Sequence, residues 1–245
     1  MGARRILRLF GEDTRDFLQG LVTNDVAKLS DGLVYAALLT PQGKYVADFF
    51  LLAEGDAVLL DVAEDLGDML TQRLSMYKLR AKVEIETAAL HLHRGLGDVP
   101  EDGHADPRAP AMGWRAYRDE AQSDDEINWD ALRVAHLIPE TGVELTPDTF
   151  ILEVGFERLN GVDFRKGCYV GQEICARMKH KTELRKGLAR VNITGQAPVG
   201  AELSVDGKTA GTLLTQAAGQ GLAYLRFDRA SGQMQAGEAV VTRAD

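Results

Sequence analysis

The chain has 245 residues, of which 45% are apolar, enough to bury a large core divided between two or three structural units. Its 37 acidic and 28 basic residues give a net charge of −9, which disfavours broad binding to nucleic acid. No apolar run reaches the length of a membrane span, and the first residues lack the apolar core of a signal peptide. Two cysteines, Cys168 and Cys175, form no disulfide framework, so we expect a protein of the reducing cytoplasm.

The first 84 residues predict an α+β unit. Short apolar, strand-like runs cover residues 5–10, 33–39, 44–52, 57–62 and 82–86. Thr40-Pro41-Gln42-Gly43 has the residues of a tight turn, which predicts a hairpin between the second and third runs. Residues 64–78 carry apolar side chains at helical spacing, the pattern of an amphipathic helix that packs on a sheet.

Between the first two runs lies a segment rich in helix-capping residues. Thr23, Asn24 and Asp25 can each cap a short turn by accepting a hydrogen bond from a backbone N–H group. Taken by spacing alone, these residues are ordinary caps.

The middle of the chain is less regular. Residues 89–93 resemble a strand in which His91 and His93 alternate onto one face, the spacing of a shared metal site. Without a third ligand nearby, an exposed pair is the favoured interpretation. Residues 95–111 predict an irregular loop, and 113–117 the end of a strand. A capped and acidic start predicts a helix from Ser123-Asp124-Asp125-Glu126.

Glu153 is a lone acid in the apolar segment 150–156. A buried carboxylate without a partner costs several kcal/mol, so a buried Glu153 needs either an ion pair with a nearby Arg or Lys or a ligand.

The segment 165–173, RKGCYVGQE, places Cys168 behind two cations, between two glycines and just before an expected short helix. The glycines suggest tight backbone turns or the close approach of another group. The cations and the helix start favour the thiolate form of the cysteine. Because most free cysteines are small buried hydrophobes, these features leave two interpretations open, a reactive thiol and a structural one.

From Gly187 onward, short alternating runs separated by glycine-containing turns predict a small antiparallel barrel. Asp206-Gly207 between two runs is a strong hairpin signal. The runs cover residues 188–193, 201–205, 209–215, 222–227 and 239–243. A basic cluster precedes the barrel, and it is either a solvated linker or a site for anions; it consists of Lys179-His180-Lys181 and Arg185-Lys186.

The stretch Lys166-Gly167-Cys168-Tyr169-Val170-Gly171-Gln172-Glu173 resembles the signature of the YgfZ-type folate-binding proteins. These are relatives of the glycine-cleavage T-protein (aminomethyltransferase) and are linked to iron–sulfur protein maturation. Further segments are similar to other motifs of that superfamily, in the same order along the chain. They are Phe17-Leu18-Gln19-Gly20, Thr23-Asn24-Asp25-Val26, the hairpin turn, Trp129 to Arg133 and residues 150–156.

The resemblance implies an α+β, T-protein-like folate-binding fold with a C-terminal antiparallel β-barrel. It predicts a discontinuous folate-binding domain of residues 1–84 and 124–182, a reduced middle domain of residues 85–123, and a barrel domain of residues 187–245. The implied cofactor is tetrahydrofolate or a one-carbon derivative of it.

The resemblance also implies roles for individual residues. Glu153 would hold the pterin ring, whose amino group and ring N–H suit one carboxylate. Cys168 would be the reactive thiol, with Lys166 beside it in the catalytic group. Arg177 would take either an ion pair or the anionic folate tail, and the basic cluster would receive a polyglutamate. The other implied folate contacts are Asn24, Asp48, Gly171, Gln172 and Glu173.

Two functions compete on this basis. One is a folate-binding factor that supports the assembly or repair of clusters in other proteins, because a cluster of the chain's own takes about four thiolates. The other is aminomethyl transfer, but T-proteins lack the cysteine motif and carry paired acids where this chain has Ala47 and Asp48. Since alanine cannot act as an acid or base, the folate-binding factor is favoured. A third interpretation, an interaction module that binds no folate, stays open because a fold does not imply a function. The expected partners are reduced folate and client iron–sulfur proteins or assembly factors. We expect the chain to be a monomer and to have no membrane partner.

Overall fold

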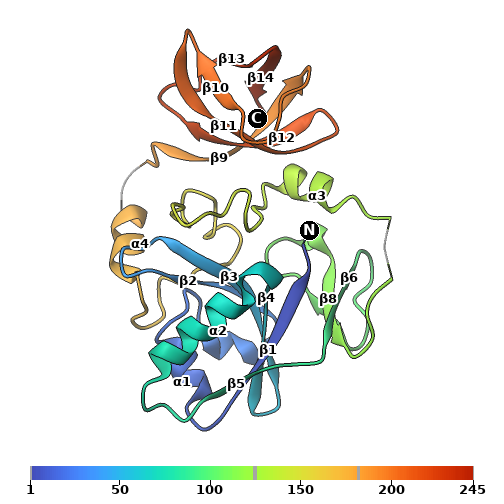
Figure 1. Ribbon diagram of the computed structural model, residues 1–245, viewed down its shortest axis with the longest axis vertical. Coiled ribbons are helices and arrows are strands. Elements are labelled where there is room, and N and C mark those ends of the chain that lie inside the picture. The colour runs from blue at the N-terminus through green and yellow to red at the C-terminus, as the bar shows by residue number, and fades with distance from the viewer. Residues whose placement is uncertain (1, 124–125, 181–182, 245) are drawn as a thin grey trace. The chain divides into compact units, whose positions relative to one another are not determined.

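The computed structural model describes residues 2–123, 126–180 and 183–244, which form two compact units (Figure 1). The first unit contains Gly2–Asp125 and Phe156–Ala176, and the barrel unit contains Glu126–Gly155 and Arg177–Asp245. This division differs from the domains predicted above. Residues 85–118 form no unit of their own, and residues 126–155 group with the barrel because their contacts lie there.

The first unit is built on a five-stranded antiparallel sheet in the order β2-β3-β4-β1-β5. Its strands are β1 (Arg4–Phe10), β2 (Val34–Leu39), β3 (Tyr45–Glu54), β4 (Ala57–Ala63) and β5 (Glu84–Thr87). The predicted turn joins β2 to β3, with the Gly43 N–H donating to the Thr40 carbonyl at 2.8 Å and a positive φ of 74° at Gly43. The predicted hairpin is confirmed.

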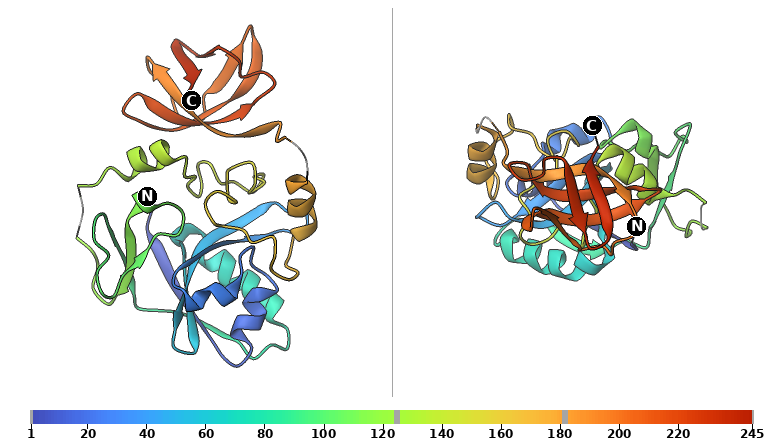
Figure 2. Two further views of the ribbon diagram at one scale, coloured as in Figure 1. Left: turned by 180° about the vertical axis from the view of Figure 1, so that it is seen from behind. Right: turned by 90° about the horizontal axis from the view of Figure 1, so that it is seen from above.

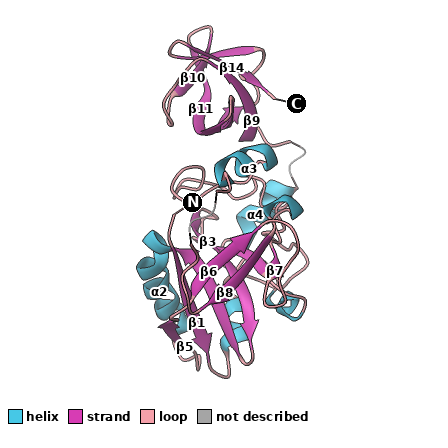
Figure 3. Ribbon diagram, turned by 90° about the vertical axis from the view of Figure 1, so that its right-hand side faces the viewer, coloured by secondary structure: helices cyan, strands magenta, loops and turns pink. Residues whose placement is uncertain are grey.

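One face of this sheet is apolar and is covered by helices. Ala47, Phe49 and Leu51 alternate onto it from β3, and Leu70 and Leu74 meet them from α2 (Glu64–Lys78). The sheet lies between α2 on one side and β6 (His91–Gly95) and β8 (Trp114–Arg118) on the other (Figure 3). Two short helices, α1 (Thr14–Gln19) and the 3-10 turn η1 (Val26–Ser30), complete this layer. Asp25 caps η1 by accepting from the Ala27 N–H at 3.0 Å.

The opposite face of the sheet carries a buried ionic network. Asp61 of β4 accepts from Arg4 and from Arg115, each at 2.6 Å, and the Arg115 guanidinium lies 3.8 Å from the centre of the Phe50 ring. Burial alone would raise the pKa of Asp61, but the charges of Arg4 and Arg115 outweigh burial and hold the pKa below 3.8. This network joins the sheet to the segment that covers it.

That covering segment is a three-stranded sheet in the order β6-β8-β7. It consists of β6 (His91–Gly95), β7 (His104–Ala105) and β8 (Trp114–Arg118). The predicted loop, residues 95–111, contains β7 and runs into the 3-10 turn η2 (Pro110–Met112). The His93 ring contacts the Glu120 carbonyl at 2.6 Å and Arg118 at 3.2 Å. Among residues 2–123, 126–180 and 183–244, no group of three or more metal-binding side chains is found.

The barrel unit begins with α3 (Trp129–His136), which starts six residues later than predicted. Asn128 caps it by accepting from the Ala131 N–H at 2.9 Å, whereas the predicted cap residues Asp124 and Asp125 lie outside the described residues. Arg133 then ties α3 to the barrel, since it donates to Glu144 and to Thr215, both at 3.1 Å.

The barrel itself is closed and antiparallel, with the strand order β10-β11-β12-β9-β14-β13 (Figure 2). Its strands are β9 (Lys186–Thr194), β10 (Glu202–Val205), β11 (Lys208–Ala217), β12 (Gln220–Arg226), β13 (Gln233–Ala236) and β14 (Ala239–Arg243). Asp206 and Gly207 both have positive φ, at 48° and 73°, as a two-residue hairpin turn requires, so this prediction is confirmed. Within the described part of the chain, no helix has the length and apolarity needed to cross a membrane.

Candidate functional site

The cysteine loop, residues 165–171, is held in place by the side chain of Lys166. Its ammonium group donates to three backbone carbonyls at the end of α1 and beyond, those of Gln19 at 2.8 Å, Val22 at 2.6 Å and Asn24 at 3.0 Å. An ammonium has three donors, so all of them are used. Lys166 is only 7% exposed. In this structure the Lys166 side chain therefore holds the loop in place, and its predicted part in a catalytic group stays a prediction.

Burial lowers the pKa of Lys166 to about 8, while Asp25 and Asp163 oppose that shift. The charged form therefore still prevails at neutral pH, and it is the form with three protons to give to three carbonyls.

A glycine fixes the other end of the cysteine loop. Gly171 has a φ of +84°, and a Cβ there would lie 2.7 Å from the Thr40 carbonyl oxygen. The loop is thus in close contact with the β2–β3 turn, where a Cβ on Gly43 would lie 2.7 Å from Ile174. This is the close approach predicted for the glycines of the loop, and it gives Gly171 a structural reason to be glycine, whereas no atom lies within 4 Å of a Cβ built on Gly167.

The two cysteines differ sharply. Cys168 is exposed on the loop between Lys166 and Gly171, whereas Cys175 is 2% exposed inside α4 (Gln172–Lys179). Burial raises the pKa of the Cys175 thiol. A buried thiol of this kind is inert, and an exposed thiol on an anchored loop is free to meet another protein.

Asn24, a predicted folate contact, makes its hydrogen bonds within the protein in this structure. Its amide donates to the carbonyls of Tyr35 at 2.8 Å and Asn160 at 2.6 Å. Its oxygen accepts from the Asp25 N–H and from Lys28, both at 2.9 Å. These four bonds use the full capacity of a carboxamide, so the side chain has none left for a ligand.

Asp48 and Ala47 point to opposite faces of the sheet, as strand alternation predicts. Ala47 is fully buried in the apolar layer under α2. Asp48 is 5% exposed and accepts from the hydroxyls of Tyr35 at 2.9 Å and Tyr45 at 2.8 Å. The carboxylate is thus directed at two tyrosines, and its predicted folate contact stays a prediction.

The Glu153 side chain, in the barrel unit, is hydrogen-bonded to a tyrosine. The hydroxyl of Tyr224, on β12, donates to its Oε2 at 2.5 Å, and the adjoining main chain is fixed by the Leu188 N–H, which donates to the Glu153 carbonyl at 2.8 Å. Over the described ranges of the chain, no ion pair involves Glu153 and its Oε1 has no hydrogen-bond partner. The predicted ion pair of Glu153 with an Arg or Lys is therefore not formed within the described part of this structure, and its Oε1 can accept a hydrogen bond from a ligand.

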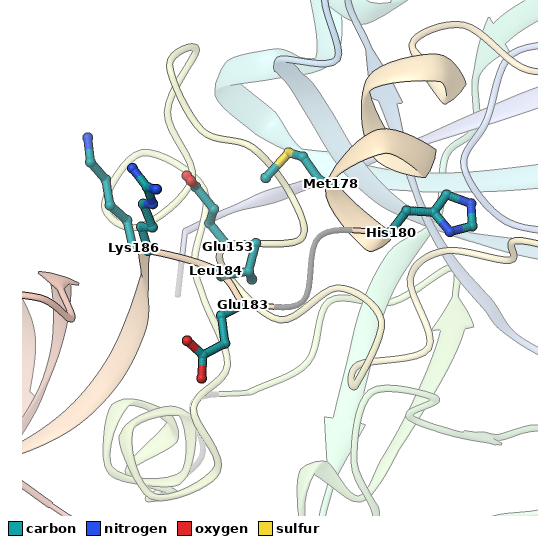
Figure 4. A pocket seen from close by; sticks show the side chains of 7 residues that line it. Glu153, Met178, His180, Glu183, Leu184 and Lys186 are labelled. Atoms are coloured by element: carbon teal, nitrogen blue, oxygen red, sulfur yellow. The ribbon is translucent and has the colours of Figure 1, made fainter.

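A cavity of about 690 Å³ lies in front of this carboxylate. It is lined by Glu153, Met178, His180, Glu183, Leu184, Arg185 and Lys186. In Figure 4 the side chains of Glu153, Met178 and Lys186 point to one side of the cavity, while Glu183 points away from them. The cavity lining therefore contains two acids, of which Glu183 points away from the others, together with two apolar side chains and a basic rim.

The remaining predicted residues lie at or after the cysteine loop. Gln172 is half-buried, with its amide 3.5 Å from the Gly167 carbonyl, and Glu173 and Arg177 are exposed. Their folate contacts stay predictions. Lys181 of the basic cluster lies outside the described residues. Sequence inspection missed Tyr224, which a period-2 pattern identifies only as a half-buried strand residue.

Comparison with known proteins agrees with this architecture. A family model described as the CAF17 C-terminal beta-barrel domain matches residues 185–244. The glycine cleavage system aminomethyltransferase T of Bartonella henselae has a similar structure, with a TM-score of 0.76 over 98% of this chain and 82% of that one. At 12% identity this likeness shows the fold, and the predicted T-protein-like fold is confirmed.

Sequence relatives are more specific. The mouse (Mus musculus) protein named iron–sulfur cluster assembly factor IBA57, mitochondrial, is 31% identical over 281 residues, covering 96% of this chain and 78% of that protein. A homologue of the same name from Mycosarcoma maydis is 28% identical over 238 residues, covering 83% of this chain and 59% of the relative. Both are named as mitochondrial proteins, which contradicts the cytoplasmic location expected from the sequence. From its identity to the mouse protein over most of both chains, this chain belongs to the IBA57 family of iron–sulfur cluster assembly factors.

Proposed function

We propose that this assembly factor is of the folate-binding, YgfZ-like type. It binds reduced folate in the Glu153 cavity and presents the thiol of Cys168 to another protein that carries or receives the cluster. The observation that supports the folate part is the half-buried Glu153 carboxylate, oriented by Tyr224, with one oxygen available at the cavity.

The cavity suits the chemistry of a reduced folate. Its volume of about 690 Å³ falls within the range of about 300–1,000 Å³ that small-molecule sites occupy. The free carboxylate oxygen is an acceptor for the amino group and ring N–H of a pterin, and Met178 and Leu184 offer apolar contacts. Arg185 and Lys186 are cations suited to the carboxylates of the folate tail. When bound, a reduced folate supplies a carrier for one-carbon units.

The thiol part rests on the cysteine loop. Cys168 is exposed, and its loop is anchored on one side by Lys166 and on the other by Gly171. An iron atom or cluster is cargo here, because two cysteines, one of them buried, cannot hold a cluster of their own. A single exposed cysteine can serve as a temporary ligand to a cluster that a partner protein carries or receives.

Calorimetric titration of the purified protein with tetrahydrofolate tests the folate part. Glu153→Gln keeps the shape of the side chain but replaces one acceptor oxygen with an NH₂ donor. We expect affinity to fall by about 1.5–3 kcal/mol, tenfold to a hundredfold, the range for a hydrogen bond to a charged group. Glu183→Gln, which lines the same cavity but points away, is the matched control and should bind as the wild type does. Equal affinity in the wild type and Glu153→Gln would sink the assignment.

A further inference from the structure

The turn after α2 holds a leucine in an unusual position. Leu79 is 87% exposed, with φ 43° and ψ −100°. The Ala81 N–H donates to the Lys78 carbonyl at 2.7 Å, so residues 78–81 form a four-residue turn with Leu79 second. A positive φ at the second position is the conformation that glycine adopts freely and that strains a leucine. Folding alone gives no reason for a large apolar side chain here, since it buries almost nothing.

The neighbours of Leu79 make a surface of mixed character. Met76, one helical turn earlier, is 67% exposed, while Leu70 and Leu74 of the same helix face the core. Three cations lie within six residues of Leu79 along the chain: Arg73, Lys78 and Arg80. In residues 2–123, 126–180 and 183–244, no ion pair engages any of the three, unlike Lys82, which pairs with Glu12 at 2.5 Å.

This basic and apolar surface stands out on a chain with a net charge of −9. Cations without ion-pair partners attract an acidic partner protein. Exposed apolar side chains beside them can then be buried in that partner and anchor it. A nucleic acid is disfavoured because the ring of Tyr77 packs against the core and leaves no open face on which bases could stack. An anionic membrane is disfavoured because the two exposed apolar side chains, Met76 and Leu79, do not make an apolar helix face. Charge complementarity therefore points to an acidic protein segment.

We propose that Met76, Leu79, Arg73, Lys78 and Arg80, here called the Leu79 surface, form a docking site for an acidic, partly apolar segment of a partner protein. Leu79 is the anchor, and the three cations set the orientation. None of these residues lines the Glu153 cavity or belongs to the cysteine loop, so the inference goes beyond the function proposed above and does not depend on it.

The first test separates folding from docking by means of Leu79→Gly. Glycine accepts the turn without strain, so this variant should unfold at the same denaturant concentration as the wild type or a higher one. A clearly lower midpoint would show that Leu79 serves the fold and would overturn the proposal.

The second test measures docking with a defined probe and the full-length protein. The probe is a fluorescein-labelled helical peptide of eighteen residues, with leucine at every third or fourth position and glutamate elsewhere, followed by anisotropy. We expect binding that weakens with salt, falls at least tenfold in Leu79→Gly, and is lost when Arg73, Lys78 and Arg80 are all changed to glutamate. Val199→Ala, which truncates another exposed apolar side chain (59% exposed), should bind the probe unchanged.

The proposal is overturned if the acidic peptide does not bind, or if a peptide with lysine in place of glutamate binds equally well. It is also overturned if Val199→Ala weakens peptide binding as much as Leu79→Gly does. Finally, it is overturned if the wild type binds phosphatidylserine vesicles or a second copy of the chain and Leu79→Gly abolishes that binding. In cells that depend on this protein, Leu79→Gly should lower the activity of iron–sulfur enzymes while tetrahydrofolate affinity stays at the wild-type value. That pattern distinguishes docking from folate binding, and full activity of the variant would contradict docking.

Discussion

Replacing Lys166 with methionine tests whether this lysine holds the cysteine loop or takes part in chemistry. Methionine keeps most of the length and apolar volume of the side chain but removes the ammonium, leaving the carbonyls of Gln19, Val22 and Asn24 without that donor. Each hydrogen bond to a charged group contributes about 1.5–3 kcal/mol. The variant no longer has to bury a charged ammonium group, and this gain offsets part of the loss. We therefore expect a net loss of about 3–5 kcal/mol in the free energy of unfolding.

For a chain of this size, about 1 kcal/mol shifts the thermal midpoint by 2–4 °C, so Lys166→Met should melt about 6–20 °C below the wild type. Calorimetry and urea unfolding measure the two quantities. Lys82→Met is the matched control, because the Lys82–Glu12 pair is exposed and such pairs contribute at most about 1 kcal/mol. A Lys166→Met protein as stable as the wild type but inactive would refute the structural role and restore the catalytic one.

Three further predictions concern acid stability, thiol reactivity and enzyme activity. Because Arg4 and Arg115 hold the pKa of Asp61 below 3.8, its contribution to stability is present above about pH 4 and is lost as pH falls through the lower folded pKa. Asp61→Asn should cost about 3–5 kcal/mol at neutral pH and flatten the decline in stability below pH 4 in urea unfolding, whereas the same change at the exposed Asp68 should do neither. Alkylation at neutral pH should label Cys168 well before the buried Cys175, as peptide mass spectrometry would show, and equal labelling would contradict the difference in exposure. With tetrahydrofolate and an aminomethylated lipoyl carrier, the protein should show no turnover, and a rate near the ~10 per second typical of enzymes would revive the transferase function.

Much of the fold was predictable because each sheet buries one face. Alternation in β3 places Ala47, Phe49 and Leu51 on the apolar face, and helical spacing marks α2 at its observed bounds, Glu64–Lys78. The Asp206-Gly207 hairpin was readable from local turn chemistry alone. By contrast, β13 has only two inward residues and offers too little apolar pattern to be seen in the sequence.

The site was less predictable, since its partners are far apart in the chain. Lys166 meets a carbonyl 147 residues earlier, and Tyr224 meets Glu153 across 71 residues. The sequence shows a lysine near Cys168, but it does not show that all three ammonium protons of Lys166 are donated to backbone carbonyls. In the same way it shows Asn24 and Asp48 as polar residues in a motif, while the structure shows that their hydrogen bonds are made within the protein.

The most direct test of the central claim is complementation by Cys168→Ser in cells that lack their own family member, with the activities of iron–sulfur enzymes as the readout. The change is close to isosteric at an exposed position, so protein level, thermal midpoint and tetrahydrofolate affinity should match the wild type. We predict that Cys168→Ser fails to restore the enzyme activities and that Cys175→Ser, provided that it folds, restores them. Full restoration by Cys168→Ser would contradict the account and show that the presented thiol is not used.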